Sequence, residues 1–280
     1  MSKIVLFGGQ GNLRMSDLVK VNSSINGKKI LNHINQSSPF SYEYFKNILS
    51  GEIPLNETYA SMLSTFIYNW WRVSEIDLSK IEYFSSHSAG IFNVAFASES
   101  VELDRLLAFI KKRADLMESY LGSEEMWLAL TSSCKDLETT VCELSEIIKV
   151  SIRTNHTTEV LAFSQSDKLK LEEHAANLGI PLRLKSLGLK IPYHTQFLSD
   201  LRDNYYQLVD NLNIIQNSSF KYLYHTKNLK QEIKNQLDIT FNWEEILLEV
   251  GRKNLEVYDL SSNRFISKNL RAMDTSIKFL

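Results

Sequence analysis

Apolar and polar positions alternate along this chain in two ways that together predict an α/β protein. Short apolar runs bounded by turn residues are typical of buried strands, and they occur at 3–7, 81–86, 222–224 and 255–258. Apolar residues that recur every three or four positions predict amphipathic helices, and they occur at 40–49, 56–72, 101–120, 195–212, 229–237, 242–250 and 265–273. Residues 13–39 are polar, and their helical pieces have no clear boundaries. Strands that alternate with helices favour a parallel, doubly wound sheet.

A second pattern interrupts the first between residues 124 and 188. Predicted strands at 126–130, 150–154, 160–163 and 182–187 alternate with predicted helices at 136–148 and 165–177. The order strand-helix-strand-strand-helix-strand is that of a ferredoxin-like unit. We therefore predict a large domain formed by residues 1–123 and 189–280, with a small subdomain inserted at 124–188.

Composition and charge then narrow the function classes. The chain has 280 residues, of which 44% are hydrophobic and 23% charged, as in ordinary soluble globular proteins. Its net charge of −2 gives no overall basic field to attract nucleic acid or an anionic membrane. The apolar segment 65–73 is too short to span a membrane, and the N-terminus has no signal-peptide pattern. Two cysteines, Cys134 and Cys142, make neither a disulfide framework nor a metal cluster, so we expect a cytoplasmic protein without a metal site.

The strongest candidate for chemistry is the turn that follows the strand at 81–86. The sequence Ser86-His87-Ser88-Ala89-Gly90 places Ser88 between this strand and a helix of small and apolar residues. This is the layout of a nucleophile elbow, G-x-S-x-G, in which small residues flank the serine because strand and helix pass close together. Ser86 replaces the first glycine. Five common residue types are a weak signal alone, so a plain loop before a buried helix remains the alternative.

Three further features have both a functional and a structural interpretation. The Gly-rich turn 8–11 lacks a nucleotide-binding motif, but it could aim N–H groups at a developing negative charge or be a plain tight turn. Arg113 is either an anion-binding residue or the last of a solvated basic run, 111–113. His194 stands at the start of a predicted helix, and a single histidine is more often structural than catalytic.

Together these segments resemble the malonyl-CoA:acyl-carrier-protein transacylases and the acyltransferase domains of polyketide synthases. Six segments occur in the family's order over nearly the whole chain. They are Phe7-Gly8-Gly9-Gln10-Gly11 for F-P-G-Q-G, Ser86-His87-Ser88-Ala89-Gly90 for G-H-S-L-G, Arg113-Ala114-Asp115-Leu116-Met117 for R-x-x-x-M, Asn155-His156-Thr157-Thr158-Glu159-Val160 for N-S-P-x-Q-V, Ile191-Pro192-Tyr193-His194 for V/I-P-x-H, and Gln236-Leu237 through Trp243 for Q-L…W. The resemblance implies an α/β-hydrolase-like parallel-sheet domain with an inserted ferredoxin-like subdomain.

The resemblance also implies a role for each matching residue. Ser88 would be the nucleophile and His194 its general base, while the N–H groups of Gln10 and Ala89 would form the oxyanion hole. Arg113 would bind the free carboxylate of a malonyl group. The remaining implied roles are substrate binding by Glu57, Met117 and Asn155, and orientation of His194 by a main-chain carbonyl near Gln236. His87 would point away from Ser88. No bound cofactor is implied, because a coenzyme A thioester is the substrate.

Several departures from the family pattern favour a specialised member. Gly8, Ser86 and Ile91 replace family residues, and the segments 155–160 and 258–260 have lost most of theirs. We therefore expect a free-standing acyltransferase that serves a polyketide synthase in trans, with malonyl-CoA and an acyl carrier protein as partners. The alternatives are an acyl-carrier-protein hydrolase on the same scaffold and a catalytically silent relative that only binds a carrier protein. The retained Arg113 favours the transferase.

Overall fold

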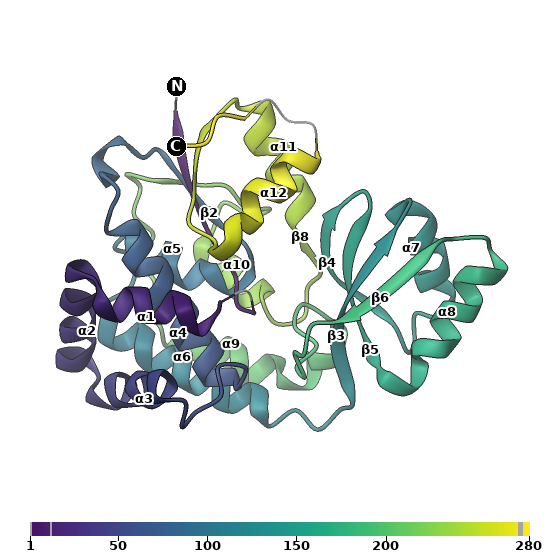
Figure 1. Cartoon of the computed structure of the whole chain (residues 1–280), viewed down its shortest axis with the longest axis horizontal. Helices are drawn as coiled ribbons and strands as arrows, with labels where there is room; N and C mark the ends of the chain where they lie inside the picture. The colour runs from purple at the N-terminus through teal and green to yellow at the C-terminus, as the bar shows by residue number, and fades with distance from the viewer. Residues whose placement is uncertain (1, 12, 274–276) are drawn as a thin grey trace.

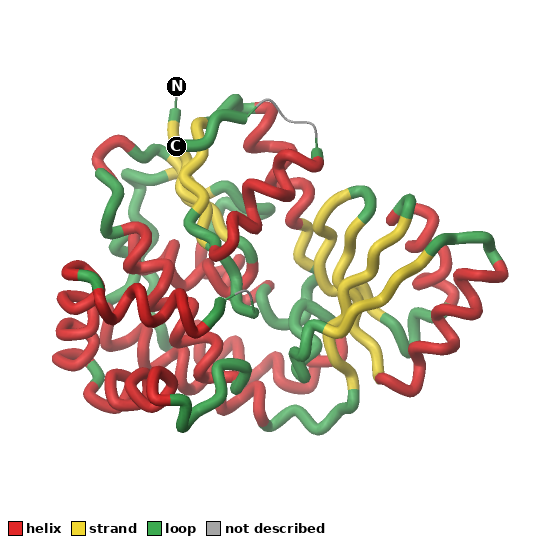
Figure 2. The backbone as a smooth tube through the Cα atoms, in the orientation of Figure 1, coloured by secondary structure: helices red, strands yellow, loops and turns green. Residues whose placement is uncertain are grey.

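The structure consists of a large α/β domain and a smaller subdomain beside it. It is a computed structural model that describes residues 2–11, 13–273 and 277–280. Figure 1 shows the large domain surrounding the N- and C-terminal ends of the chain, and the small subdomain projecting from it. Figure 2 shows the strands gathered in two separate groups, one in each part.

The large domain is built on a four-stranded parallel sheet in the order β7-β2-β1-β9. The strands are β1 (Lys3–Phe7), β2 (Tyr83–Ser86), β7 (Lys221–Tyr222) and β9 (Glu256–Asp259). Residues 4–7 are fully buried, as expected for a parallel sheet covered on both faces. Phe7 pairs with Ser86, so β1 and β2 end side by side. This register brings the Gly-rich turn and the predicted elbow to the same edge of the sheet.

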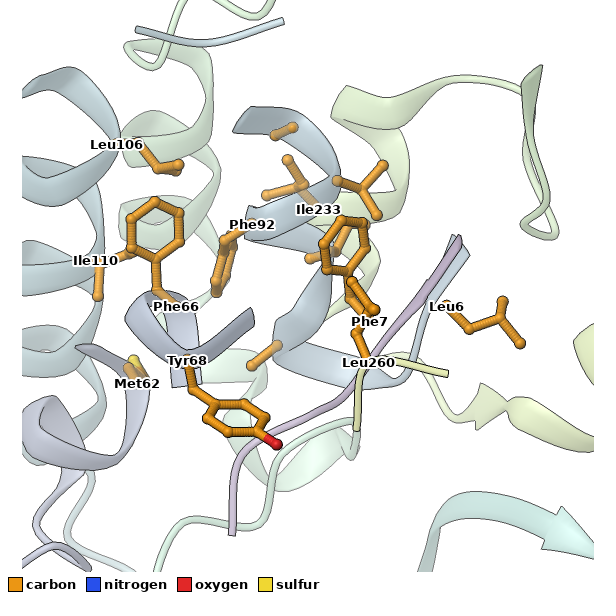
Figure 3. Packing of buried hydrophobic residues seen from close by; sticks show 14 of the residues in the cluster. Leu6, Phe7, Met62, Phe66, Tyr68, Phe92, Leu106, Ile110, Ile233 and Leu260 are labelled. Carbon is orange, nitrogen blue, oxygen red and sulfur yellow. The ribbon is translucent and has the colours of Figure 1, made fainter. Parts of the chain in front are cut away.

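Helices cover this sheet and supply most of the core. Phe66, Phe92 and Ile110 come from three different helices and lie close together in Figure 3. The helices of the large domain are α1 (Met15–Ser23), α2 (Ile25–Ser37), α3 (Pro39–Ser50), α4 (Thr58–Val73), α5 (Ile91–Ala97), α6 (Leu103–Glu118), α9 (Arg202–Asp210), α10 (Leu229–Asn235), α11 (Trp243–Arg252) and α12 (Phe265–Ala272). Short 3-10 helices lie at Leu78–Lys80, Ser88–Gly90, Gln196–Leu201 and Ser262–Arg264. None of the helices among the described residues is both long and apolar enough to cross a membrane.

The small subdomain has the predicted ferredoxin-like order. Its strands form an antiparallel sheet in the order β6-β3-β5-β4, and its two helices lie against one face of this sheet. The elements are β3 (Glu124–Thr131), α7 (Cys134–Glu143), β4 (Lys149–Asn155), β5 (Thr158–Ser164), a 3-10 turn (Gln165–Asp167), α8 (Lys168–Asn177) and β6 (Leu182–Ser186). The other face carries Met126, Leu128, Ile152 and Val160 and faces the large domain.

The two parts of the protein are less separate than the predicted domain boundaries imply. β8 (Phe241–Asn242) pairs in parallel with β4, so the segment 189–280 adds a fifth strand to the small sheet. A two-residue strand has no periodicity of its own, and only its pairing partner defines it. The domains therefore share a sheet as well as a boundary.

Three stretches of secondary structure differ from the expectation. Residues 13–39 contain two regular helices, α1 and α2, whose buried faces are narrow: Leu18 and Val21 in α1, and mainly Ile30 and Ile34 in α2. The helix predicted at 136–148 ends at Glu143, because a turn is needed before the chain enters β4. The helix predicted at 195–212 is divided into a 3-10 segment and α9.

Candidate active site

Ser88 lies on a strained turn between β2 and α5, as the elbow pattern predicts. Its φ of +45° is rare for a residue with a side chain and is typical of functional turns. A Cβ at Gly90 would lie 2.7 Å from the Gly8 carbonyl oxygen, so glycine is required there. Ser86 is tolerated at the other flanking position, where its hydroxyl hydrogen-bonds that of Tyr224 at 2.6 Å. The departure from G-x-S-x-G therefore leaves the elbow intact.

His194 is the partner of Ser88, although 106 residues separate them. Its Nε2 lies 2.8 Å from the Ser88 Oγ. The backbone holds the histidine in place: its φ is +61°, and its N–H donates to the Leu237 carbonyl at 2.8 Å. The ring stacks on Phe241, with 5.4 Å between ring centroids. This geometry suits a serine nucleophile and a general base.

Burial keeps the His194 imidazole neutral. Burial, then the positive charge of Arg113 and then His87 lower the pKa of His194 from 6.5 to about 3. A neutral ring whose Nε2 accepts the Ser88 proton must carry its own proton on Nδ1. No acceptor for Nδ1 is present in the described part of the chain, and the buried Gln236 side-chain oxygen is likewise unpartnered there. The predicted orienting carbonyl near Gln236 thus stays a prediction, while the neighbouring Leu237 fixes the backbone.

His87, which precedes the nucleophile, lies among aromatic rings. The edges of Phe241, Trp243 and Phe265 approach it, with centroid distances of 5.8, 5.3 and 5.1 Å. Its burial lowers its pKa to about 4. This is the packed environment that we predicted for His87, while His194 stays the predicted base.

Gln10 and Ala89 lie on the two loops that meet at the ends of β1 and β2. Gln10 lines the same cavity as Ser88, and Ala89 follows Ser88 in the 3-10 turn. The two loops are joined by a hydrogen bond from the His87 N–H to the Phe7 carbonyl at 2.9 Å. Both residues therefore stand where N–H groups near Ser88 are needed, and their oxyanion role remains a prediction.

Arg113 is buried near His194, which overturns the interpretation of a solvated basic run. Its side chain is only 2% exposed, and Lys112 of the same run is exposed. The guanidinium carbon lies 5.0 Å from the Tyr193 ring centroid and 5.3 Å from that of Phe92, and Nη1 lies 3.2 Å from the Met62 sulfur. Within the described part of the chain no carboxylate pairs with Arg113. A buried charge without a counter-charge is costly, so this arrangement favours an anion-binding role for Arg113, which stays a prediction.

A cavity of about 430 Å³ opens at Ser88 between the two domains. Its wall from the small sheet is apolar, while Lys185 and Lys268 supply cationic groups. Arg113 is not part of the lining; Tyr193 lines the cavity and lies over the guanidinium. A second cavity of about 440 Å³ shares Gln10, Leu189 and Tyr193 with the first.

The other predicted substrate-binding residues do not line the Ser88 cavity and lie either nearer the protein surface or deeper in the protein. Glu57 is exposed on the rim of the second cavity, where it accepts a hydrogen bond from the Tyr44 hydroxyl at 2.5 Å. Met117 is fully buried in the hydrophobic core and is not among the residues that line these two cavities, so its substrate-binding role stays a prediction. Asn155 shapes a turn by accepting the Thr157 N–H at 3.0 Å, and it reaches the Ser88 cavity only through Asn269, 3.5 Å away.

The sequence analysis missed two buried amides: Asn69, which contacts the Gly-rich turn, and Asn93, which contacts Asn69. The available signal was the polarity of Asn93 in the otherwise apolar helix α5. Among the described residues, no group of three or more His, Cys, Asp or Glu side chains could hold a metal ion.

Solved structures with the same architecture were found. The chain matches an acyl-carrier-protein S-malonyltransferase from Burkholderia pseudomallei over 100% of its length and 95% of that chain, with a TM-score of 0.87 and 15% identity. The chain has the malonyltransferase fold. A malonyl-transacylase solved in complex with a type II polyketide acyl-carrier protein gives a TM-score of 0.86 at 12% identity, covering 100% of this chain and 95% of the other.

Two polyketide proteins extend this likeness. The acyltransferase domain from the second module of the salinomycin polyketide synthase gives a TM-score of 0.80 at 12% identity, over 100% of this chain and 68% of the other. The polyketide biosynthesis protein PksE of Bacillus subtilis is 21% identical over 191 residues, which is 65% of this chain. The chain spans about a quarter of that relative's length, 24%. No family model matches the chain.

Proposed function

We propose that this protein is an acyltransferase that moves a malonyl or related carboxylated acyl group from coenzyme A, through acyl-Ser88, to the phosphopantetheine thiol of an acyl carrier protein. The observation that carries the proposal is the buried guanidinium of Arg113 beside the Ser88–His194 pair, 2% exposed and without a carboxylate partner in the described part of the chain. A dicarboxylic acyl group would bring its own carboxylate to this charge. The malonyltransferase fold supports the same chemistry.

Acylation would use groups that are already in place. The Ser88 Oγ attacks the thioester carbonyl carbon as its proton passes to His194 Nε2, 2.8 Å away. The N–H groups of Gln10 and Ala89 stabilise the negative charge on the former carbonyl oxygen. The carbon–sulfur bond then breaks, and His194 returns the proton to the departing sulfur of coenzyme A.

Transfer reverses these steps with a different thiol. The carrier's phosphopantetheine thiol gives its proton to His194 and attacks the Ser88 ester, and the serine leaves with that proton. Lys185 and Lys268 line the cavity at Ser88, and they would attract the phosphate that coenzyme A and the carrier's arm have in common. The polyketide proteins among the matches favour a polyketide synthase as the recipient, served in trans. The unpaired Cys134 and Cys142 suit the reducing cytoplasm.

Intact-mass measurement tests the proposal directly. The protein is mixed with malonyl-CoA or with acetyl-CoA, and the mass added to it is followed over time. We expect one malonyl group on Ser88, no adduct on Ser88→Ala, and rapid discharge when a carrier protein with its phosphopantetheine arm is added. An adduct that persists in Ser88→Ala, on Cys134 or Cys142, would refute the elbow as the reacting site.

The hydrolase remains a second candidate because of one observation. The cavity at Ser88 has an apolar wall, and the Tyr193 ring separates it from Arg113. An uncharged acyl chain could occupy this cavity without reaching Arg113. The decay of acyl-Ser88 separates the two candidates: rapid loss to free acid without a carrier, with release of acyl groups from acyl-carrier proteins, would replace the transferase by the hydrolase. The close Ser88–His194 pair argues against a silent relative.

A further inference from the structure

Two asparagines lie fully buried in the large domain, behind the Gly-rich turn. Asn69 belongs to α4 and Asn93 to α5, and each is 1% exposed. The other buried residues of α5 are apolar, whereas α4 buries Ser61, Ser64 and Thr65 together with its apolar residues. A buried amide costs free energy unless it is hydrogen-bonded, and leucine would fill such a position without that cost. Residues that break the local pattern in this way often serve a site.

The amides form a relay that ends on the Gly8 carbonyl. Asn69 Nδ2 donates to the Gly8 oxygen at 2.8 Å and to Asn93 Oδ1 at 3.0 Å, and Asn93 Nδ2 donates to the Phe66 carbonyl at 2.8 Å. Since the two carbonyl oxygens can only accept, they fix which way each amide faces. Asn69 thus connects the turn after β1 to the helix that begins at the elbow.

Gly8 directly follows β1, so its carbonyl oxygen lies beyond the hydrogen bonds of the parallel sheet. The Phe7 carbonyl is still held by the His87 N–H, at 2.9 Å, while the Gly8 carbonyl beyond it is held by Asn69. Peptide planarity means that fixing this oxygen also fixes the Gly9 N–H. Gly9 must remain glycine, because a Cβ there would lie 2.6 Å from the His87 ring nitrogen. Two successive glycines are flexible without such a hold.

We infer that Asn69, supported by Asn93, is a positioning residue that sets the place of the Gln10 N–H relative to Ser88. This inference rests on the proposed oxyanion role of Gln10. Ala89 is fixed by the elbow itself, whereas Gln10 comes from another strand and depends on the path of residues 8–9. The relay joins these two loops, so it determines the spacing between the two N–H donors.

Three variants test the relay. Asn69→Leu removes the hydrogen bond to Gly8 while keeping the branched shape of the side chain, and Asn93→Ala leaves the Gly8 bond but frees the Asn69 amide. Thr65→Val is the matched control, because Thr65 is buried in the same helix and its hydroxyl donates to the Ser61 carbonyl at 2.8 Å, away from the turn. Each variant is measured for the rate of Ser88 acylation at saturating malonyl-CoA, for KM, and for inhibition by a trifluoromethyl ketone analogue of the thioester, which places an oxyanion in the hole.

We expect Asn69→Leu to slow acylation by about 10–100-fold with KM within about 2-fold, since a misplaced donor acts on the transition state. Inhibition by the trifluoromethyl ketone should weaken by the same factor. Asn93→Ala should lose about 3–10-fold, and Thr65→Val should match the wild type. Unchanged acylation in Asn69→Leu, a loss carried by KM alone, or an equal loss in Thr65→Val would overturn the inference.

Two further measurements keep the test decisive. If Asn69→Leu does not fold, the test of the inference depends on Asn93→Ala. Wild-type acylation rates in Asn93→Ala would then overturn the relay. If the wild type takes no acyl group from malonyl-CoA, the proposed function fails, but acylation of Ser88 by p-nitrophenyl acetate still uses the same oxyanion. The variants should then show the same order of losses with that ester, and equal rates would refute the relay on their own.

Discussion

The two sheets of this molecule contribute to the cavity at Ser88 in different ways. The parallel sheet of the large domain contributes its edge: the loops after β1 and β2 carry Gln10 and Ser88, which line the cavity. The antiparallel sheet of the small subdomain contributes a side-chain face, with Leu128 and Ile152 on it. Reactive groups thus come from strand ends, where backbone N–H groups are free, and the binding wall comes from a pleated surface.

Both parts bury ionisable groups. The large domain buries His87, His194 and Arg113 near the cavity and also the carboxylates of Glu232 and Asp238, whereas the small subdomain buries Glu159, which is 2% exposed. Burial and the nearby Glu138 raise the pKa of Glu159 to about 7, against the lowering effect of Arg153. The comparison teaches that an unpaired buried charge is a candidate for catalysis only where a cavity can bring it a ligand. The predictions below test this difference.

The largest effect is expected at His194, the proposed general base in the large domain. His194→Ala should slow Ser88 acylation by about 10²–10⁴-fold, the usual contribution of a positioned general base. Because the pKa of His194 is about 3, acylation by the wild type should stay flat as the pH falls from about 8 to 5. Quenched intact-mass time courses measure both. A wild-type rate that falls with an apparent pKa near 6.5 would show that His194 is not held neutral.

Arg113 should control the choice of acyl group. Arg113→Ala should reduce malonyl transfer relative to acetyl transfer by about 100-fold, because a buried carboxylate without its partner costs roughly 3 kcal/mol or more. Lys112→Ala, at the exposed neighbouring position, is the control and should change neither malonyl transfer nor acetyl transfer. Competition between the two thioesters, read as the ratio of adduct masses, gives the result. Equal losses for both substrates would remove Arg113 from the site.

The pH dependence of stability should differ in sign between the two buried histidines, His87 and His194, and Glu159. The pKa values of His87 and His194 lie below 6.5 in the folded protein, so each contributes stability that is lost as the pH falls from 6.5 towards about 4, at about 1.4 kcal/mol per pH unit. The pKa of Glu159 is raised from 4.5 to about 7. The contribution of Glu159 to the stability of the folded protein is therefore lost as the pH rises from 4.5 to about 7. Glu159→Gln should therefore stabilise the protein at pH 7 and steepen the loss at lower pH.

Urea unfolding followed at several pH values measures this balance. Glu146→Gln, a change at an exposed position of the same subdomain, is the matched control and should leave the profile unchanged. A Glu159→Gln protein with the wild-type stability at pH 7 would mean that Glu159 is ionised in the folded state at little cost.

The smallest effect is expected at Glu57. Because Glu57 is exposed on the rim of the second cavity, Glu57→Gln should change the hydrolysis of acyl-Ser88 by about 2-fold or less, as surface substitutions usually do. The decay of the adduct mass without a carrier protein measures it. A slowing of tenfold or more would assign water activation to Glu57 and favour the hydrolase.

Several features of the fold and site could be predicted from sequence because their signals are local. The strand, tight turn and helix around Ser88 lie within a short stretch, and the six alternating elements of the small subdomain follow one another directly. Two features could not be predicted for a physical reason. The boundaries of the helices at 13–39 were not predicted, because few residues of these helices are buried and apolar. The strand at 241–242 was missed, because only its pairing with β4 defines it.

The sequence by itself determined which residues were candidates: a serine at an elbow, a histidine after a proline, and an arginine on a helix. Only the tertiary structure decided where they lie and what they contact. It brought His194 to 2.8 Å from Ser88, enclosed Arg113 between aromatic rings, and joined Asn69 to Gly8 across 61 positions of the chain. Periodicity reports which face of an element is apolar, whereas burial without a partner and contact across the chain depend on how the elements pack against one another.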